Sequence, residues 1–293
     1  MCLIETRPSV LVMFSLRFAA GATLGAQALD VRGGTPWQMV GTGLVWVTAI
    51  FAVYLFNGVM DVTEDRANGS ARPIARGELE PDVAFAVARG AALLSLAGAA
   101  LLPSPIAWMV LILLALGYAY SGPPFHLKRR SGPAAAIGML ACLLTYAAGF
   151  VVQSDECWVA RAEPLVVFTL AVSLWTGLVG ILTKDLSDIE GDAEAGRSTL
   201  GVTRGEETVR LLAAGAALAT ATAFGAVVLL LDLPLVGAVV TMFVGAIVVT
   251  VVTLGPLSRG DRAHRRRPYR AFMTTQYGVH LILVVVMAYP PVA

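Results

Sequence analysis

Residues 233–256 read LPLVGAVVTMFVGAIVVTVVTLGP and contain no charged side chain. A membrane-spanning helix needs about 20 consecutive apolar residues, with a range of about 17–25, and this stretch has that length. Eight further apolar stretches predict spanning helices at approximately 9–28, 37–57, 83–102, 105–121, 133–152, 164–183, 208–231 and 271–289. The sequence therefore predicts an all-α integral membrane protein of about nine helices, with a single domain over residues 1–293.

The composition of the whole chain supports this interpretation. Hydrophobic residues make up 57% and charged residues 14%, and the mean hydropathy is +0.75, whereas a soluble domain has about 25% charged residues. The lipid bilayer is therefore an expected partner. Ala26-Gln27-Ala28 resembles a signal-peptide cleavage site, but Arg17 inside the first apolar stretch favours a retained helix. Gly21-x-x-x-Gly25 predicts a small-residue packing seam in that helix.

Basic residues sort into alternate connections between the predicted helices. Because cytoplasmic loops carry an excess of Lys and Arg, this sorting predicts a protein of the cell inner membrane with a cytoplasmic N-terminus, four cytoplasmic polar loops and an outside C-terminus. The opposite connections hold only Arg32 and Arg161. We interpret the run Arg265–Arg267 as a topology determinant that touches anionic lipid, and no nucleic-acid partner is expected. The loops predicted to be cytoplasmic hold Arg66, Arg72, Arg76, Lys128, Arg129, Arg130, Lys184, Arg197, Arg204, Arg210 and six arginines between Arg259 and Arg270.

Acidic residues gather in two of these loops. Thirteen of the 20 Asp and Glu residues lie in windows 61–82 and 185–207, although acids needed only for solubility would be scattered among all the loops. In the first window, Asn57, Asp61 and Asp65 are spaced four apart. On a helix this spacing gives one stripe that drifts by about 40° per step.

The second window repeats the pattern at a different spacing. Asp185, Asp188 and Asp192 stand at i, i+3 and i+7, so a helix places them on one face. Carboxylates stacked in this way repel one another unless a cation lies between them, and oxygen ligands without His or Cys favour Mg²⁺. The remaining acids of the two windows are interpreted as solvated helix caps: Glu64, Glu78, Glu80, Asp82, Glu190, Glu194, Glu206 and Glu207.

Cations follow each acidic stretch. Arg72 and Arg76 follow the first stretch, and Arg197 follows the second. The chain has nineteen arginines but only two lysines, Lys128 and Lys184, and both flank these loops. A diphosphate needs metal ions on its oxygens together with direct donors, of which Arg supplies a bidentate fork and Lys a point charge.

Four stretches together resemble the UbiA superfamily of membrane prenyltransferases, in that family's order and over nearly the whole chain. The resemblance of the fourth stretch is closest to the branch of chlorophyll synthases, homogentisate prenyltransferases and archaeal geranylgeranylglyceryl-phosphate prenyltransferases. The chain departs from the family in having Gly58 where Asp or Gln usually follows the Asn, and Pro124 where some members have Tyr. The four stretches are Arg7-Pro8; Asn57-x-x-x-Asp61-x-x-x-Asp65 with Arg72-Pro-Ile-x-x-Gly77; Tyr120-Ser-x-Pro-Pro-x-x-Leu-Lys128; and Lys184-Asp-x-x-Asp-x-Glu-Gly-Asp-x-x-x-Gly-Arg-x-Thr-Leu200.

The resemblance implies a bundle of nine transmembrane helices around a central cavity, which opens laterally to lipid and is capped on the cytoplasmic side. It implies two Mg²⁺ ions on an allylic diphosphate, held by Asn57, Asp61, Asp65, Asp185, Asp188 and Asp192. Arg72, Lys128 and Arg197 are expected to neutralise the departing diphosphate, and Arg17 and Tyr120 are further candidates for binding it. The implied catalytic residues are Asp61, Asp65, Asp185, Asp188, Arg72 and Lys128.

The expected reaction is transfer of a prenyl group from a prenyl diphosphate donor to a hydrophobic acceptor, aromatic or quinone-like, with release of diphosphate. A membrane terpene cyclase, which the same superfamily includes, is the alternative. A non-enzymatic transporter is less favoured, because its ionisable residues are expected along a path near mid-membrane, whereas here they gather at one face. The sequence leaves open the acceptor, the prenyl length and the oligomeric state.

Overall fold

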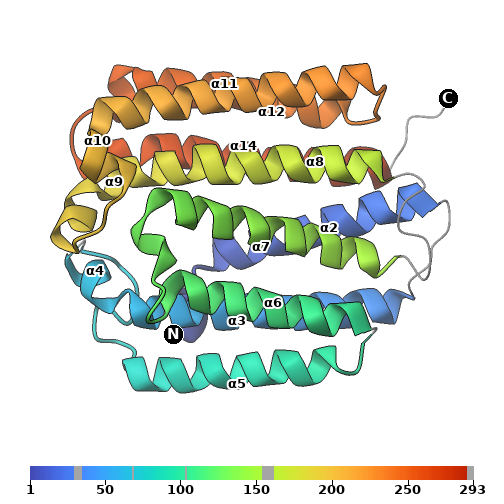
Figure 1. The fold of residues 1–293 in the computed structure, drawn as a ribbon, viewed down its shortest axis with the longest axis horizontal. Coiled ribbons are helices and arrows are strands. Elements are labelled where there is room, and N and C mark those ends of the chain that lie inside the picture. The colour runs from blue at the N-terminus through green and yellow to red at the C-terminus, as the bar shows by residue number, and fades with distance from the viewer. Residues whose placement is uncertain (30–34, 68, 103, 154–161, 289–293) are drawn as a thin grey trace. The chain divides into compact units, whose positions relative to one another are not determined.

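The computed structural model describes residues 1–29, 35–67, 69–102, 104–153 and 162–288, and the regular elements of these ranges are helices (Figure 1). By their packing the residues form two compact units. Unit 1 comprises Met1–Lys128 with Leu144–Trp158, and unit 2 comprises Arg129–Leu143 with Val159–Ala293. The expectation of one domain over residues 1–293 stays a prediction. Arg32 and Arg161, used above to predict the topology, lie outside the described residues.

Unit 1 is built around one long helix. α3 packs against α5 and α6, which run beside it in Figure 1, and also against α1 and α2. The elements are α1 (Cys2–Glu5), α2 (Pro8–Leu29), α3 (Pro36–Met60), α4 (Val62–Ala67), α5 (Pro81–Ala99), α6 (Ser104–Ser121), the short 3-10 helix η1 (Leu127–Arg129) at its end, and the second half of α7 (Ser131–Val151).

Close packing of α2 against α7 in unit 1 depends on glycine. A Cβ atom at Gly21 of α2 would collide with the backbone carbonyl of Tyr146, and one at Gly25 would lie 3.1 Å from the ring of Phe150. Small residues of this kind allow helices to approach closely inside a membrane. The packing seam predicted from Gly21-x-x-x-Gly25 is therefore confirmed.

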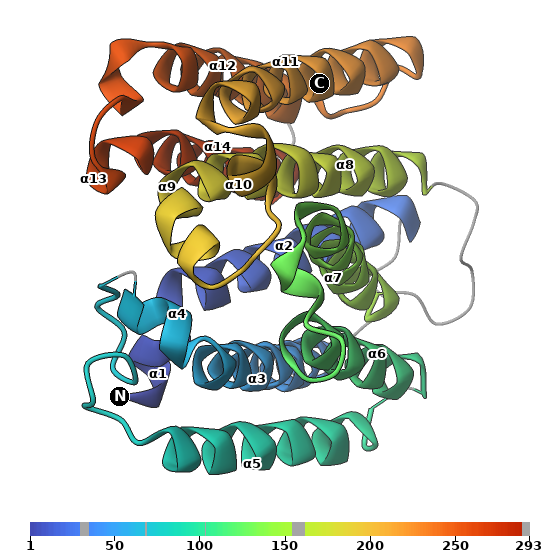
Figure 2. The same ribbon diagram turned by 60° about the vertical axis from the view of Figure 1, so that its left-hand side comes forward.

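Unit 2 contains the C-terminal helices. α12 packs against both α11 and α14, and α11 packs against α8 and α9. Figure 2 shows the short helix α13 at the turn between α12 and α14. The elements are the first half of α7, α8 (Glu163–Leu174), the π-helical turn η2 (Trp175–Gly180), α9 (Ile181–Glu194), α10 (Leu200–Arg204), α11 (Glu206–Leu230), α12 (Val236–Leu254), the 3-10 helix η3 (Pro256–Ser258), α13 (Arg262–Arg265) and α14 (Arg267–Ala288).

The lengths of these helices confirm the predicted class of protein. Among the described residues, eight helices are long and apolar enough to cross a membrane, and the apolar helix α6 is a shorter ninth. Their positions match the nine predicted stretches. α12 exposes Val240, Val244 and Val251, as expected of a helix that faces lipid. The chain is a multi-pass membrane protein.

One predicted boundary is wrong. The stretch 164–183 was predicted as the spanning segment, but the helix continues beyond it through η2 and α9 to Glu194, which puts the second acidic motif on a helix as its spacing indicated. The physical reason is an apolar contact that the polar composition of this segment conceals. Leu182 and Leu186 of α9 are buried against Val209 and Ala213 of α11. The second acidic motif is therefore helical throughout.

Candidate active site

The first acidic motif lies where α3 gives way to α4. α3 ends at Met60, and Asp61 adopts φ −99° and ψ 4°, so the helical geometry considered for the four-residue spacing is interrupted at this residue. The backbone nevertheless keeps the four-residue spacing. The amide of Asp61 donates to the carbonyl of Asn57 at 3.0 Å, and the amide of Asp65 donates to that of Asp61 at 2.7 Å. The interruption at Asp61 therefore does not change the four-residue spacing of Asn57, Asp61 and Asp65.

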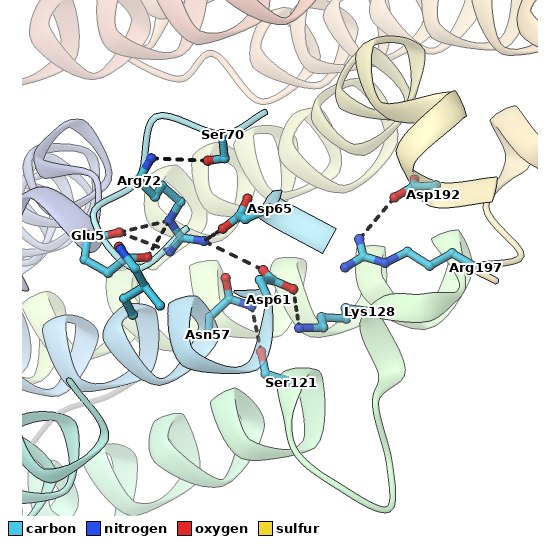
Figure 3. A network of polar contacts seen from close by, with 11 residues as sticks. Glu5, Asn57, Asp61, Asp65, Ser70, Arg72, Ser121, Lys128, Asp192 and Arg197 are labelled. Carbon is cyan, nitrogen blue, oxygen red and sulfur yellow. Dashed lines mark hydrogen bonds and ion pairs between the residues drawn. The ribbon is translucent and has the colours of Figure 1, made fainter. Parts of the chain in front are cut away.

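A buried group of charges surrounds this motif in unit 1 (Figure 3). We call it the Arg72 cluster, and it consists of Glu5, Asp61, Asp65, Arg72 and Lys128. Arg72 Nη1 lies 2.7 Å from Asp65 Oδ2 and 3.9 Å from Asp61 Oδ2, and Lys128 Nζ lies 2.5 Å from Asp61 Oδ1. The side chains of Arg72 and Lys128 are 6% and 4% exposed. Three carboxylates thus face two cations in a place from which water is largely excluded.

Apolar packing brings the loop that carries Arg72 to this position. Ile74 is buried with Leu55 of α3 and with Ala84 and Ala88 of α5. This anchor fixes the backbone two residues after Arg72, so the guanidinium is held beside the end of α3. The sequence motif Arg-Pro-Ile therefore combines a charge with the apolar residue that places it.

Asn57 is held by a residue of the Tyr120-Ser-x-Pro-Pro stretch to which the sequence analysis gave no role. Its Nδ2 donates to Ser121 Oγ at 2.7 Å, and Ser121 is buried at the end of α6. The neighbouring Tyr120, a predicted diphosphate ligand, is only partly buried. Ser121, rather than Tyr120, makes the contact with the motif that the structure shows.

The second acidic motif lies along α9 in unit 2. Each of its three aspartates, which we call the α9 carboxylates, has its own partner. Asp185 accepts from Ser131 Oγ at 2.7 Å, Asp188 from Arg262 Nη2 at 3.1 Å, and Asp192 from Arg197 Nη1 at 3.2 Å. Of these partners, the sequence indicated Arg197, together with Lys184 beside the motif. The structure adds Ser131 and Arg262.

Arg262 is positioned by the short helix α13. Asp261 caps this helix, and its Oδ1 accepts from the backbone N–H of His264 at 3.0 Å. That hydrogen bond, together with the one from the His264 ring, holds the pKa of the Asp261 carboxyl below its usual range. Arg262 then donates through Nε to the carbonyl of Ser187 at 3.1 Å as well as to Asp188. Arg265, interpreted above as lipid-facing, instead pairs with Glu190 at 2.5 Å.

Two other basic residues have different surroundings. The guanidinium of Arg17 is buried and lies 4.7 Å from the centre of the Phe14 ring, a favourable cation–π arrangement. Arg76 is exposed and pairs with Glu78. The proposed contact of Arg17 with a diphosphate stays a prediction.

The chemistry of the donors suits Mg²⁺. Both motifs offer carboxylate oxygens. Neither unit has an all-protein metal cage among its described residues, because no three His, Cys, Asp or Glu side chains there lie close enough together to hold a metal ion. Mg²⁺ is commonly bound through one or two carboxylates plus substrate phosphates rather than by a cage made wholly of protein. Carboxylates that are balanced by Arg and Lys fit that mode of binding. The convergence of both motifs on shared ions stays a prediction.

Glu5, Ser121, Ser131 and Arg262 were missed by sequence analysis. A lone acid two residues before the Arg7-Pro8 pair was a usable signal for Glu5. Arg262 belongs to a group of arginines that was interpreted only as the mark of a cytoplasmic loop, so its contact with the second acidic motif was not expected. Ser121 stands in the quoted stretch Tyr120-Ser-x-Pro-Pro-x-x-Leu-Lys128, which was a usable signal, but no role was assigned to it. Ser131 carries no sequence signal, since a buried serine that satisfies a neighbour looks like any other serine.

Comparison with known proteins agrees with this geometry. The pattern that defines the UbiA prenyltransferase family matches residues 19–277, a range that includes both acidic motifs. The chain therefore belongs to the UbiA prenyltransferase family, and the resemblance stated from the sequence is confirmed.

Two curated relatives extend the comparison. A probable homogentisate phytyltransferase 2 of Oryza sativa subsp. japonica chloroplasts is 29% identical over 234 residues, which cover 72% of this chain and 59% of the relative. A homogentisate phytyltransferase of Synechocystis is 33% identical over 184 residues, covering 56% and 55%. The chain thus spans between half and two thirds of the lengths of these relatives.

Solved structures share the fold. A UbiA homologue from Archaeoglobus fulgidus bound to DMAPP and Mg²⁺ superposes with a TM-score of 0.70 at 19% identity, over 96% of this chain and 99% of that one. A digeranylgeranylglyceryl phosphate synthase gives 0.68 at 15% identity, over 98% and 97%. These comparisons confirm the predicted class of all-helical membrane fold.

Proposed function

We propose that this chain transfers a prenyl group from an allylic prenyl diphosphate to a hydrophobic aromatic acceptor, with Mg²⁺ as cofactor. The observation that carries the proposal is the family match over both acidic motifs, each of which consists of largely buried carboxylates paired with cations. The two curated relatives are named as homogentisate phytyltransferases. Their names favour an aromatic acceptor. The A. fulgidus homologue, which shares the fold, binds DMAPP and Mg²⁺.

In this proposal the charged residues bind the head of the donor. Asn57, Asp61 and Asp65 of unit 1 and Asp185, Asp188 and Asp192 of unit 2 would hold Mg²⁺, expected to be two ions. Mg²⁺, when bound, neutralises the diphosphate and orients it. Arg72, Lys128 and Arg197, each of which pairs with at least one of these carboxylates, turn their donors to the phosphate oxygens.

The reaction then follows from the charges. The bond between C1 of the prenyl group and the diphosphate oxygen breaks, and the electron pair leaves with the diphosphate. Preorganised cations stabilise the negative charge that develops there. The allylic carbon forms a new bond to an electron-rich acceptor carbon, which then loses a proton. The long tail explains the membrane location, since each buried methylene contributes about 0.8 kcal/mol to partitioning out of water.

The orientation in the membrane is part of the same proposal. The sorting of basic residues supports an orientation with the N-terminus and both acidic motifs on the cytoplasmic side of the inner membrane, and the C-terminus outside. The donor head then meets the protein from the aqueous side that contains Mg²⁺ and soluble diphosphates. The tail would enter from the lipid side.

The proposal predicts an acceptor-dependent reaction. We expect the purified protein to release diphosphate from labelled geranyl or geranylgeranyl diphosphate only when Mg²⁺ and an aromatic acceptor such as homogentisate are both present. The measurement is diphosphate release together with chromatography of the organic product. Chelation of Mg²⁺ with EDTA should stop both.

Controls separate the competing activities. Equal diphosphate release without acceptor, accompanied by a cyclised hydrocarbon or alcohol, would show a cyclase and contradict the proposal. Failure to release diphosphate from dimethylallyl, geranyl, farnesyl and geranylgeranyl diphosphates with a panel of phenolic and quinone acceptors would contradict it more broadly.

A further inference from the structure

Glu5 is a buried acid at the N-terminus of the chain that belongs to the Arg72 cluster. It ends the short helix α1, and its exposed fraction is 0%. Its carboxylate Oε1 lies 2.8 Å from Arg72 Nε, and its Oε2 accepts from the backbone N–H of Ile74 at 2.9 Å. Its carbonyl oxygen also accepts from Arg72, at 3.2 Å from Nε and 3.0 Å from Nη2.

These contacts determine the orientation of Arg72. Glu5 engages Nε and Nη2, which leaves Nη1 as the nitrogen that faces Asp65 and Asp61. The bond to the amide of Ile74 ties the same carboxylate to the backbone of the loop that carries Arg72. A buried charge is costly unless it is paired and hydrogen-bonded. Glu5 is ion-paired with Arg72 through Oε1 and hydrogen-bonded to Ile74 through Oε2.

The neighbouring helix is shaped to admit this contact. A Cβ atom at Gly58 of α3 would collide with Glu5 Oε1 and would lie 2.9 Å from Arg72 Nη2. Gly58 stands directly after Asn57 and three residues before Asp61. The absence of a side chain at this point therefore opens the space that the Glu5–Arg72 pair fills beside the acidic motif.

We propose that Glu5 is a positioning residue that balances the charge of Arg72 and so keeps Asp61 and Asp65 available to Mg²⁺-diphosphate. The inference rests on the proposed function of the same site. Without the Glu5 carboxylate, the carboxylates of the described residues that pair with the buried guanidinium are those of Asp65 and Asp61. These carboxylates are then drawn to Arg72 in competition with the metal ion.

The variant Glu5→Gln tests this inference. The probe is geranyl thiodiphosphate, a donor analogue that resists ionisation, and calorimetry of its binding is repeated at stepped Mg²⁺ concentrations. We expect the Mg²⁺ concentration for half-maximal binding to rise by about tenfold, because loss of a residue that orients metal ligands lowers metal affinity by about 10- to 100-fold. Glu5→Asp, which keeps the charge, should recover part of this loss.

Glu78→Gln is the matched control. It removes the same charge from the Arg76–Glu78 pair, which is exposed in the same loop, and exposed pairs contribute little. Its Mg²⁺ requirement should equal that of the unchanged protein. A Glu5→Gln protein with an unshifted requirement would contradict the inference while leaving the proposed function intact. Absence of Mg²⁺-dependent binding in the unchanged protein would contradict the proposed function itself.

A second variant tests whether the effect of Glu5→Gln is only a folding defect. Gly58→Ala keeps Glu5 but fills the space that its carboxylate occupies, so it should raise the Mg²⁺ requirement as Glu5→Gln does. Gly90→Ala, at a helical glycine of α5 with open space around its Cβ position, is the control. Thermal unfolding of each detergent-solubilised variant is measured in parallel. A shift that appears only in unfolding, with an unchanged Mg²⁺ requirement, would reduce Glu5 to a purely structural role.

Discussion

Asp61→Asn is expected to reduce Mg²⁺-dependent prenyl transfer by about 100- to 1,000-fold, the range seen when one preorganised electrostatic group is removed from an active site. Asp61 is the residue on which the two cations of the Arg72 cluster converge, at 2.5 Å from Lys128 and 3.9 Å from Arg72. Asparagine keeps the shape of the side chain but removes its charge. The loss should therefore fall on metal binding and turnover. Initial rates at saturating donor are the measurement.

Asp82→Asn provides the matched control for this prediction. It makes the same chemical change at an exposed residue in the first turn of α5. Its rate should stay within about twofold of the unchanged protein, since substitutions at exposed surface positions seldom change the free energy of unfolding by more than about 0.5 kcal/mol. Full activity of Asp61→Asn at saturating Mg²⁺ would end the assignment of Asp61 to the metal site.

Lys128→Gln is expected to lower kcat/KM for the donor by about 100-fold, the loss typical of removing one preorganised electrostatic group. Most of this loss should appear in kcat. Lys128 is 4% exposed on its side chain and pairs with Asp61. In the proposed reaction its ammonium meets the negative charge that develops on the departing diphosphate, and a contact that strengthens in the transition state affects kcat more than binding. Steady-state kinetics with varied donor separate the two constants.

Arg129→Gln is the control for Lys128. Arg129 follows Lys128 in the chain, but its side chain is exposed. Loss of this charge should leave kcat near that of the unchanged protein. An equal loss of activity in both variants would mean that the net charge of the loop, rather than the buried ammonium of Lys128, sets the rate.

The fold was predictable because lipid leaves few alternatives. A chain in a membrane satisfies its backbone hydrogen bonds within helices, so apolar stretches such as 233–256 specify both the type of element and its position. The prediction was wrong where an element is held by apolar packing rather than by overall hydropathy. Leu182 and Leu186 extend the helix past 183 through contacts with α11, and the polar residues between them conceal this signal.

The candidate site was predictable to a smaller extent. Spacing alone indicated Asn57, Asp61 and Asp65, because carboxylates at helical intervals need a cation, and the structure places Arg72 and Lys128 beside two of them. Spacing did not reveal Glu5, which meets Arg72 across 67 positions of sequence. It did not explain Gly58 either, because the need for a glycine follows only from the neighbours that occupy the space, Glu5 and Arg72.

The measurement that tests the account most directly is Mg²⁺-dependent binding of geranyl thiodiphosphate to Asp61→Asn and Asp188→Asn. The central claim is that carboxylates of both motifs, one from each compact unit, serve the same bound diphosphate. It predicts that either substitution alone lowers affinity by at least the about 10- to 100-fold that is typical for loss of a residue that only orients a metal ligand, and that the double variant is little worse than either single one. Wild-type affinity in either single variant would contradict the claim.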